Sequence, residues 1–273
     1  MKNFMKWSGI VLGLVLLAGL ALYPIGMKKL TRSYPGIRVD PVSLPTGPDA
    51  IARGRHIAIA WGCAKCHGED LSGMLLANDP FLGTIPASNL TSGDGGIASS
   101  YSDVDWVRAI RHGVKPDGSL EIFMYDYYST MSDQDLGALI AYIKQLPPVD
   151  AHYPVRRFGP VIAIAPAIGL FTPAAETIDH SAARPADPTI GATIEYGRYL
   201  SAICSECHAN SLPLKIKNWT QADFMRAFRS GLLPDGKQLS PAMSMKTYGE
   251  LSDTELTALW LYLQSVLPVE SQK

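Results

Sequence analysis

The sequence predicts an all-α protein in which one helical module occurs twice, behind an N-terminal helix that spans a membrane. Three features predict this arrangement: an uncharged apolar run near the N-terminus, two copies of one cysteine motif, and the same helix signals around each copy. The composition agrees, because 47% of the residues are hydrophobic and 18% are charged, against roughly 25% charged in an average soluble protein. Part of the chain is therefore expected to avoid water.

The charge balance and the cysteine count exclude two other classes of protein. With 24 Lys and Arg against 25 Asp and Glu and no basic run, the chain lacks the charge excess that binds phosphates, so no nucleic-acid partner is expected. The four cysteines lie in two short clusters, which is not the pattern of a disulfide-rich secreted scaffold.

The N-terminal run predicts a membrane anchor, or an uncleaved signal, over residues 1–30. The uncharged residues 7–27 follow two lysines and reach about 31 Å as a helix, which is enough to cross a bilayer. The alternative is a cleaved signal peptide, but the apolar region of such a peptide usually has about 7 to 15 residues. The small residues Gly19 and Ala21 make only a weak cleavage site. A retained single-pass anchor is the better interpretation.

The cysteine motifs predict two covalently bound haems c. Residues 63–67 (CAKCH) and 204–208 (CSECH) have the form C-x-x-C-H, at which c-type haem is attached. The two thiols of a copy can form thioethers to one haem, and the next histidine then binds its iron. The residues are Cys63, Cys66 and His67 in the first copy and Cys204, Cys207 and His208 in the second. A thioredoxin-like motif needs a βαβ context and a zinc site needs four neighbouring ligands, and neither explains the histidines.

The helices around each motif repeat as well. A glycine opens an apolar pattern before the motif, a glycine ends a short helix after it, and a Ser N-cap with an acid at N3 starts the last helix. These residues are Gly54 and Gly197, Gly113 and Gly231, Ser132 and Ser252, and Asp135 and Glu255. The apolar face of each last helix is expected to pack against the glycine of the first, where a missing side chain permits close approach.

The repeat sets the expected domain boundaries. We expect helical domains at residues 45–150 and 191–273, joined by a linker at 151–190 that is rich in Pro and Ala. Its apolar residues 161–171 are too few to cross a membrane. They are expected to pack on one or both modules, with shallow contact with the bilayer as the alternative.

Methionines supply candidates for the second axial position of each iron. A thioether there raises the reduction potential relative to a second histidine. Met124 and Met243 lie in the loops before the two last helices, although the core is the usual place of a methionine. Met131 directly precedes the Ser132 cap, where an apolar residue commonly packs on the N4 residue, here Leu136.

The other histidines belong to no haem motif. His112 is expected to contact solvent or a haem propionate. His56, His152 and His180 are expected at the surface.

On these motifs the chain resembles the class I c-type cytochromes, and among them the membrane-anchored cytochrome subunits of periplasmic alcohol, aldehyde and sugar-acid dehydrogenases. Residues 80–85 (PFLGTI) and 89–91 (NLT) are similar to a stretch of that family, as are residues 243–256 and 124–136 to its Met-Pro segment and last helix start. Tyr125 and Ser244 stand where the family has Pro. The resemblance implies two tandem class I cytochrome c domains and His/Met ligation, by His67 with Met124 and by His208 with Met243. It also implies that the Pro80 and Pro213 carbonyls accept the ring N–H of the proximal histidines.

The resemblance implies an electron carrier rather than an enzyme. We expect it to pass single electrons between periplasmic or membrane redox proteins, such as a dehydrogenase, a quinol-oxidising complex or a terminal oxidase. Haem attachment occurs outside the bacterial cytoplasmic membrane, so the haem domains are expected in the periplasm with the N-terminal helix in the bilayer. Two alternatives are a structural subunit and a dihaem enzyme of the peroxidase or sulfur-compound oxidase type. The enzyme needs an open iron position, against which the two methionines argue.

Overall fold

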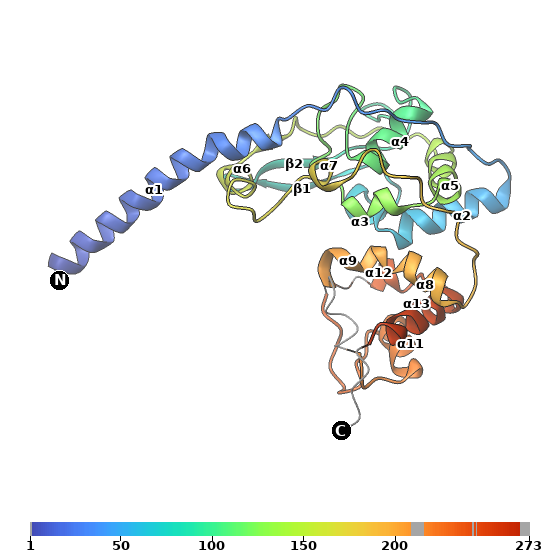
Figure 1. Ribbon diagram of the computed structural model, residues 1–273. Helices are drawn as coiled ribbons and strands as arrows, with labels where there is room; N and C mark the ends of the chain where they lie inside the picture. Colours follow the sequence, from blue (N-terminus) through green and yellow to red (C-terminus); the bar gives the residue numbers. More distant parts are fainter. Residues whose placement is uncertain (1, 209–215, 242, 244, 268–273) are drawn as a thin grey trace. The chain divides into compact units, whose positions relative to one another are not determined.

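The computed structural model describes residues 2–208, 216–241, 243 and 245–267 (Figure 1). The chain forms two compact units, each built from three separate segments. Unit 1 contains Met1–Pro41, Ser72–Asp126 and Pro148–Ser181, and unit 2 contains Val42–Leu71, Tyr127–Pro147 and Ala182–Lys273. Both units therefore draw on the expected domain 45–150 and on the expected linker 151–190. The expected domain boundaries stay predictions. The two units are defined by which segments contact one another, whereas each expected domain is a continuous stretch of the chain.

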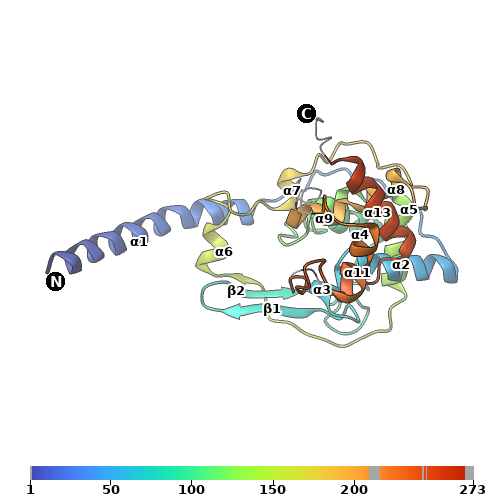
Figure 2. The same ribbon diagram turned by 90° about the horizontal axis from the view of Figure 1, so that it is seen from below.

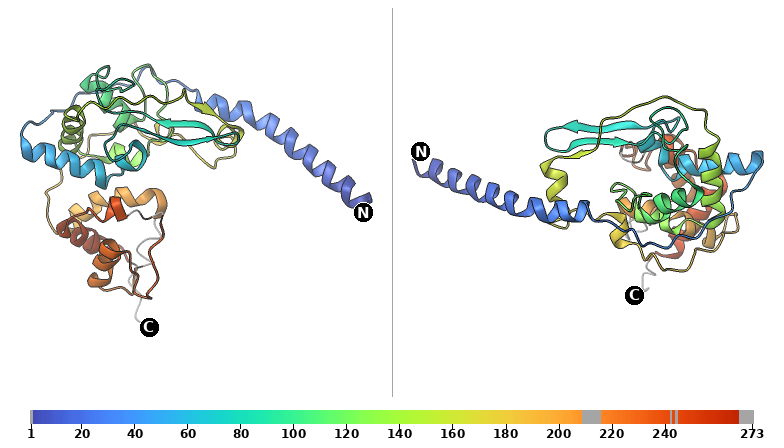
Figure 3. Two further views of the ribbon diagram at one scale, coloured as in Figure 1. Left: turned by 180° about the vertical axis from the view of Figure 1, so that it is seen from behind. Right: turned by 90° about the horizontal axis from the view of Figure 1, so that it is seen from above.

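Unit 1 begins with the predicted apolar helix, α1 (Lys2–Leu30). Among the described residues, Lys6–Leu30 form one helix that is long and apolar enough to cross a membrane, with a mean hydropathy of 2.3. Its N-terminal half extends beyond the rest of unit 1 (Figures 1 and 3), and its large apolar side chains are exposed. This is the pattern expected of a helix whose surroundings are lipid.

The C-terminal half of α1 packs against a short helix of the expected linker, α6 (Pro160–Ile164) (Figure 2). A Cβ atom at Gly26 would lie 1.8 Å from the Ala163 carbonyl oxygen, so only glycine permits this approach. At Gly19 a Cβ atom would lie 3.7 Å from Ile164 Cδ1. The linker's apolar residues therefore pack on the anchor helix, a contact that the sequence did not predict.

Unit 1 also contains a small antiparallel sheet, so the chain is mostly helical rather than all-α. The strands are β1 (Met74–Asp79), β2 (Gly83–Ala87) and β3 (Arg157–Phe158), paired in that order (Figure 3). The β1–β2 turn is local: the Asp79 carboxylate accepts the N–H of Phe81 at 2.8 Å and of Leu82 at 2.9 Å, and Gly83 adopts a φ of +96°. A register shift between Leu75 and Ala77 breaks the alternation that would have marked β1 as a strand.

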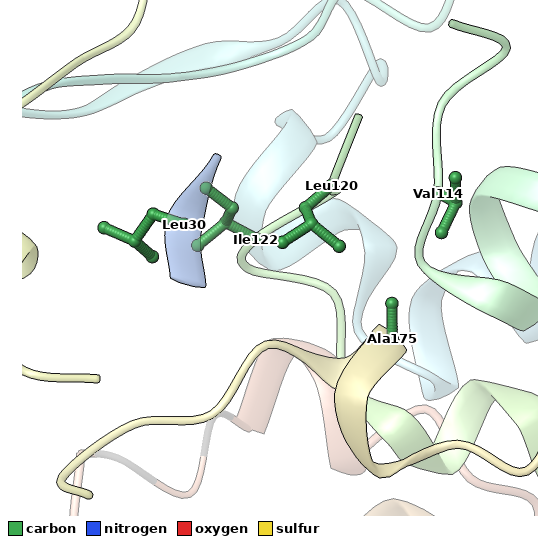
Figure 4. Packing of buried hydrophobic residues seen from close by; sticks show 5 residues of the cluster. All are labelled: Leu30, Val114, Leu120, Ile122 and Ala175. Atoms are coloured by element: carbon green, nitrogen blue, oxygen red, sulfur yellow. The ribbon is translucent and has the colours of Figure 1, made fainter. Parts of the chain in front are cut away.

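The core of unit 1 lies beside helix α4 (Asp103–His112) and the short helix α7 (Ala174–Thr177). Ser102 and Asp105 form a capping box at the start of α4. Gly113 ends α4 with a φ of +63°, which confirms the predicted stop. The buried side chains of this core are those of Leu30, Val114, Leu120, Ile122 and Ala175 (Figure 4). The last residue of α1 thus belongs to the same core as the loop after α4.

Unit 2 consists of helices. They are α2 (Pro48–Ala60), α3 (Cys63–His67), α5 (Asp133–Lys144), α8 (Ile194–Leu200), α9 (Ala202–His208), α11 (Gln221–Ser230), α12 (Met245–Tyr248) and α13 (Asp253–Ser265). The 3-10 helix η1 (Asp126–Thr130) leads into α5. Ser132 and Ser252 cap α5 and α13 as predicted, each accepting the backbone N–H three residues on.

Two helix pairs of unit 2 pack in the same way. A Cβ atom at Gly54 of α2 would lie 2.0 Å from the Ala138 carbonyl oxygen of α5. A Cβ atom at Gly197 of α8 would lie 1.9 Å from the Ala258 carbonyl oxygen of α13. The expected close approach at both glycines is therefore confirmed.

Candidate haem sites

The first cysteine motif forms a single turn of helix, α3, after the end of helix α2. Gly62 separates α3 from α2 with a φ of +85°, a conformation that glycine adopts without strain. Burial, helped by the charge of Cys66, raises the pKa of the Cys63 thiol to about 12. Burial also raises the pKa of Cys66. Such surroundings disfavour the thiolate that a redox motif or a zinc ligand requires and suit an uncharged thioether.

In the second motif, on α9, the pKa of the first cysteine is shifted in the same direction as that of Cys63. Burial and the neighbouring Cys207 raise the pKa of the Cys204 thiol to about 12. His208, at the end of α9, lies with its Nε2 3.5 Å from the Sδ of Met243. A backbone hydrogen bond of 2.8 Å from Met243 N to Ser240 O forms the turn that carries this thioether. The structure thus brings together the two side chains expected on opposite faces of the second haem.

The residues expected at the first haem belong to both units. His67 lies in unit 2, whereas Met124 and Pro80 lie in unit 1. Met124 is half-buried and its N–H donates to the Glu121 carbonyl at 3.2 Å. Pro80 is exposed in the turn between β1 and β2. Their roles stay predictions, and Pro213 lies outside the described residues.

Met131 is placed as its staple position predicts. It is fully buried in unit 2, as is Leu136 at N4 of α5. The Met131 side chain therefore packs in the core of unit 2, and Met124 stays the candidate ligand for the distal position of the first haem.

An aromatic cluster covers the start of the first motif, and the sequence did not predict it. Trp61 is 2% exposed, and its ring centroid lies 6.1 Å from Tyr127, 6.4 Å from Tyr128 and 5.6 Å from Tyr199. The Tyr128 hydroxyl donates to the Trp61 carbonyl at 2.9 Å. Burial, followed by the neighbouring Cys63, raises the pKa of Tyr128. These rings form an apolar cluster at the junction of α2 and α3, directly before the first cysteine motif.

A second unpredicted feature is a set of polar side chains where α2 and α5 meet α8 and α13, here called the Arg53 cluster. Its members are Arg53, His56, Asp135, Tyr196, Tyr199 and Glu255. Arg53 donates from Nε and Nη2 to the Asp135 carboxylate, each at 2.9 Å, and from Nη1 to Glu255 at 3.3 Å. Both carboxylates are 4% exposed. A buried carboxylate needs such partners, because an unpaired charge in the interior is costly.

The Arg53 cluster has approximate twofold symmetry. When Gly54 is aligned with Gly197, Arg53 corresponds to Tyr196 and His56 to Tyr199. Within a copy, Arg53 binds Asp135 and Tyr196 binds Glu255 at 3.1 Å. Between the copies, His56 Nε2 lies 2.8 Å from Glu255 and the Tyr199 hydroxyl lies 2.8 Å from Asp135. Each carboxylate is therefore held by residues of both copies.

The Arg53 cluster shifts several pKa values. Burial alone would raise the pKa of Glu255, but the hydrogen bond and charge of His56 and the hydrogen bonds of the Ser252 cap outweigh it and hold the pKa at about 2. Burial would lower the pKa of Arg53, and the hydrogen bond with Asp135 reverses the direction. Burial raises the pKa of Tyr196 to about 12. The cluster therefore keeps Glu255 ionised and its two tyrosines protonated at neutral pH.

Of the four histidines outside the haem motifs, His56, His112 and His180 are more buried than expected, and His152 is exposed. His56 is partly buried in the Arg53 cluster rather than free at the surface. His112 is 7% exposed, so the expected contact with solvent is wrong: its Nδ1 lies 3.0 Å from His180 Nδ1, and His180 Nε2 lies 3.0 Å from the Ala175 carbonyl. His152 is exposed as expected. The partners come from distant segments, which a search for repeated motifs does not connect.

Comparison with protein families identifies one domain of the chain. Residues 51–147 match the family described as Cytochrome c. The chain therefore contains a cytochrome c domain, which includes the first cysteine motif and both α2 and α5.

Curated relatives extend the similarity over more of the chain. The fructose dehydrogenase cytochrome subunit of Gluconobacter japonicus is 25% identical, over 83% of this chain and 54% of the relative. The gluconate 2-dehydrogenase cytochrome c subunit of Pantoea cypripedii is 30% identical, over 61% of this chain and 38% of the relative. A diheme cytochrome c-type protein of Cereibacter sphaeroides is 27% identical, over 93% of this chain and 99% of the relative. The chain thus spans about half or less of the two dehydrogenase subunits it matches.

Proposed function

Because residues 51–147 belong to the cytochrome c family, we propose that this chain is a dihaem cytochrome c, the electron-transfer subunit of a membrane-associated dehydrogenase. The observation that carries the proposal lies outside the family match. It is the second C-x-x-C-H motif, whose His208 Nε2 lies 3.5 Å from the Met243 sulfur. This proximity supports a second haem site in the second copy, beside the one proposed in the first.

Each proposed site divides the work among the same residue types. When bound, the haem iron takes up and releases one electron. The cysteines, Cys63 with Cys66 and Cys204 with Cys207, tether the group through thioethers, so it stays with the protein in either redox state. His67 with Met124 and His208 with Met243 would bind the two irons, and the methionine thioethers would raise the potentials relative to a second histidine. The Pro80 and Pro213 carbonyls would accept the ring N–H of His67 and His208 and fix the orientation of each imidazole.

The repeated helix packing supports two tandem class I cytochrome c domains, at residues 45–150 and 191–273. The glycine contacts at Gly54 and Gly197 are the same to within 0.1 Å, at 2.0 and 1.9 Å. The two caps, Ser132 and Ser252, also start equivalent helices. A duplicated module explains both coincidences.

The proposed partners and location follow from the relatives and from α1. Relatives are named as cytochrome subunits of fructose and gluconate dehydrogenases, so a dehydrogenase is the proposed electron donor. A quinol-oxidising complex or a terminal oxidase is the other redox partner. With α1 in the bacterial cytoplasmic membrane, the haem domains lie in the periplasm and meet these proteins at the membrane surface.

The test counts haems and probes their sixth position. Intact mass of the denatured holoprotein should show the chain plus two haems, and the paired variants Cys63→Ala/Cys66→Ala and Cys204→Ala/Cys207→Ala should each lose one. Neither reduced haem should bind carbon monoxide readily, because a methionine occupies the position. One haem in the wild-type protein would disprove the dihaem proposal. Rapid, stoichiometric carbon monoxide binding at either haem would favour an enzyme.

A further inference from the structure

We propose that residues 159–170 form a second membrane-embedded element, which inserts into the periplasmic leaflet of the bilayer beside α1. The inference rests on the proposed anchor and goes beyond it. A single helix tethers a protein without orienting it, whereas two embedded elements of unit 1 would fix this unit at the membrane surface.

The first support is the depth at which α1 and α6 touch. The contact of Gly19 with Ile164 lies about 12 Å from residue 27, at about 1.5 Å per residue. Residue 27 ends the uncharged run and so marks the edge of a hydrocarbon core about 30 Å thick. If residues 7–27 cross the bilayer, the side chain of Ile164 must lie inside the outer leaflet. Gly26 and Ala163 meet near its edge.

The second support is the chemistry of the segment that touches α1. No charged residue occurs between Arg157 and Glu176. Val161 is 48% exposed, Ile168 57% and Leu170 76%. These are large apolar side chains that water solvates poorly, and a cluster of them next to a spanning helix fits acyl chains.

The third support is the backbone, most of whose N–H groups have partners within the segment. The N–H groups of Ala163, Ala165, Ala167, Ile168, Gly169 and Leu170 all donate to carbonyls within residues 159–166. Pro160 and Pro166 have no N–H to satisfy, and Lys29 Nζ donates to the Pro166 carbonyl at 3.0 Å. A non-spanning segment can enter hydrocarbon only when its backbone polar groups have internal partners.

The β1–β2 turn borders this apolar surface through Phe81, while the Asp79 carboxylate is held by the backbone of the turn. The Val161 N–H donates to the Phe81 carbonyl at 3.1 Å, and the Gly159 N–H donates to the Leu82 carbonyl at 2.9 Å. Phe81 is 68% exposed, so its ring extends the apolar surface of α6. The basic residues Lys28, Arg32 and Arg157, all exposed, flank this surface in sequence and suit anionic headgroups.

The proposal predicts the depth of individual side chains. The holoprotein would be placed in vesicles of phosphatidylethanolamine and phosphatidylglycerol, with a nitroxide on one added cysteine: Leu170→Cys, Ile168→Cys, Leu14→Cys in α1, or Ser99→Cys as an exposed control in unit 1. Since the four native cysteines bind haem, only the added thiol is labelled. Haem content confirms that each variant folds. The labels at 14, 168 and 170 should collide several-fold more often with oxygen than with a water-soluble nickel chelate, and the label at 99 should show the reverse.

Each other outcome overturns the proposal in a recognisable way. If the label at 14 is embedded but those at 168 and 170 reach the nickel chelate, the anchor stands and the second element does not. If labels at 168 and 170 are shielded from both reagents, the surface is covered by protein, and a partner subunit replaces the bilayer as its occupant. If the label at 14 also reaches the chelate, the anchor itself is wrong.

Discussion

The two copies of the C-x-x-C-H module share their helices but differ in the segments between these helices. In the first copy, residues 68–102 separate α3 from α4 and contain the β1–β2 hairpin, whereas in the second copy residues 209–220 separate α9 from α11. Met124 and residues 72–102 of the first of these segments belong to unit 1, which also contains α1. The second copy lies within unit 2. The glycines and helix caps thus determine the helix packing of each copy, whereas the loops differ in length and in the unit to which they belong.

The largest effect is expected from the axial methionines, where the two copies should respond alike. Met243→Ala should abolish the sulfur-to-iron charge-transfer band of one haem and lower its potential, and Met124→Ala should do the same for the other, because each removes the sixth ligand. Met131→Ala is the control, since it should leave both bands intact and cost about 2 to 5 kcal/mol of unfolding free energy. Loss of a band in Met131→Ala, with the band retained in Met124→Ala, would reverse the assignment in the first copy.

Substitutions at the two contact glycines, Gly54 and Gly197, should destabilise the two copies by similar amounts. Gly54→Ala and Gly197→Ala each place a methyl group within 2.0 Å of a carbonyl oxygen, and such overpacking costs about 3 kcal/mol. Urea unfolding followed by far-UV circular dichroism measures this loss. Gly36→Ala, where nothing lies within 4 Å, should behave as wild type. A loss at only one of the two positions would mean that the copies are not equivalent in packing.

The Arg53 cluster should make the free energy of unfolding depend on pH through Glu255, which belongs to the second copy. The folded-state pKa of Glu255 is about 2, below its ordinary value of about 4.3. Its contribution is therefore fully present above about pH 4.3 and is lost as the pH falls toward 2, with a total of about 2 to 3 kcal/mol. In Glu255→Gln this part of the acid dependence should disappear, while Glu195→Gln, an exposed control, retains it. Unfolding free energies between pH 2.5 and 7 would decide; parallel curves for wild type and Glu255→Gln would contradict the assignment.

The smallest effect is expected at the other ion pair between the copies. Lys246 Nζ lies 2.7 Å from Glu69, with 85% and 83% of the two side chains exposed. Water and salt screen such a pair, so Lys246→Ala should not shift the urea midpoint measurably. A shift as large as that of Glu255→Gln would show that surface charge, rather than the buried cluster, holds the copies together.

The sequence predicted the parts of the structure that depend on local signals. The caps at Ser132 and Ser252, the stop at Gly113 and the close approach at Gly54 and Gly197 each follow from a residue type and its neighbours. The haem motifs are equally local. These features could be predicted because a few adjacent residues determine them.

The features that the sequence did not predict depend on distant or unlike residues. The hairpin of β1 and β2 contains a register shift that hides its alternation. The Arg53 cluster pairs an arginine in one copy with a tyrosine in the other, so comparison of the copies shows no common motif. His112 and His180 meet across 68 positions of sequence. The acids at N3 of both last helices were visible, but only the structure shows that they are buried and shared.

The shared carboxylates have a consequence for the rate at which charge moves along the chain. The rate of electron tunnelling between two carriers falls steeply with their separation. A separation that varies would therefore make the rate vary. In unit 2 the helices that carry both cysteine motifs, α3 and α9, follow directly from α2 and α8, and Asp135 and Glu255 each bind residues of both. To change the spacing of α2 and α8, buried ion pairs would have to break. If both motifs hold haem as proposed, the cluster keeps the distance between the two haems constant.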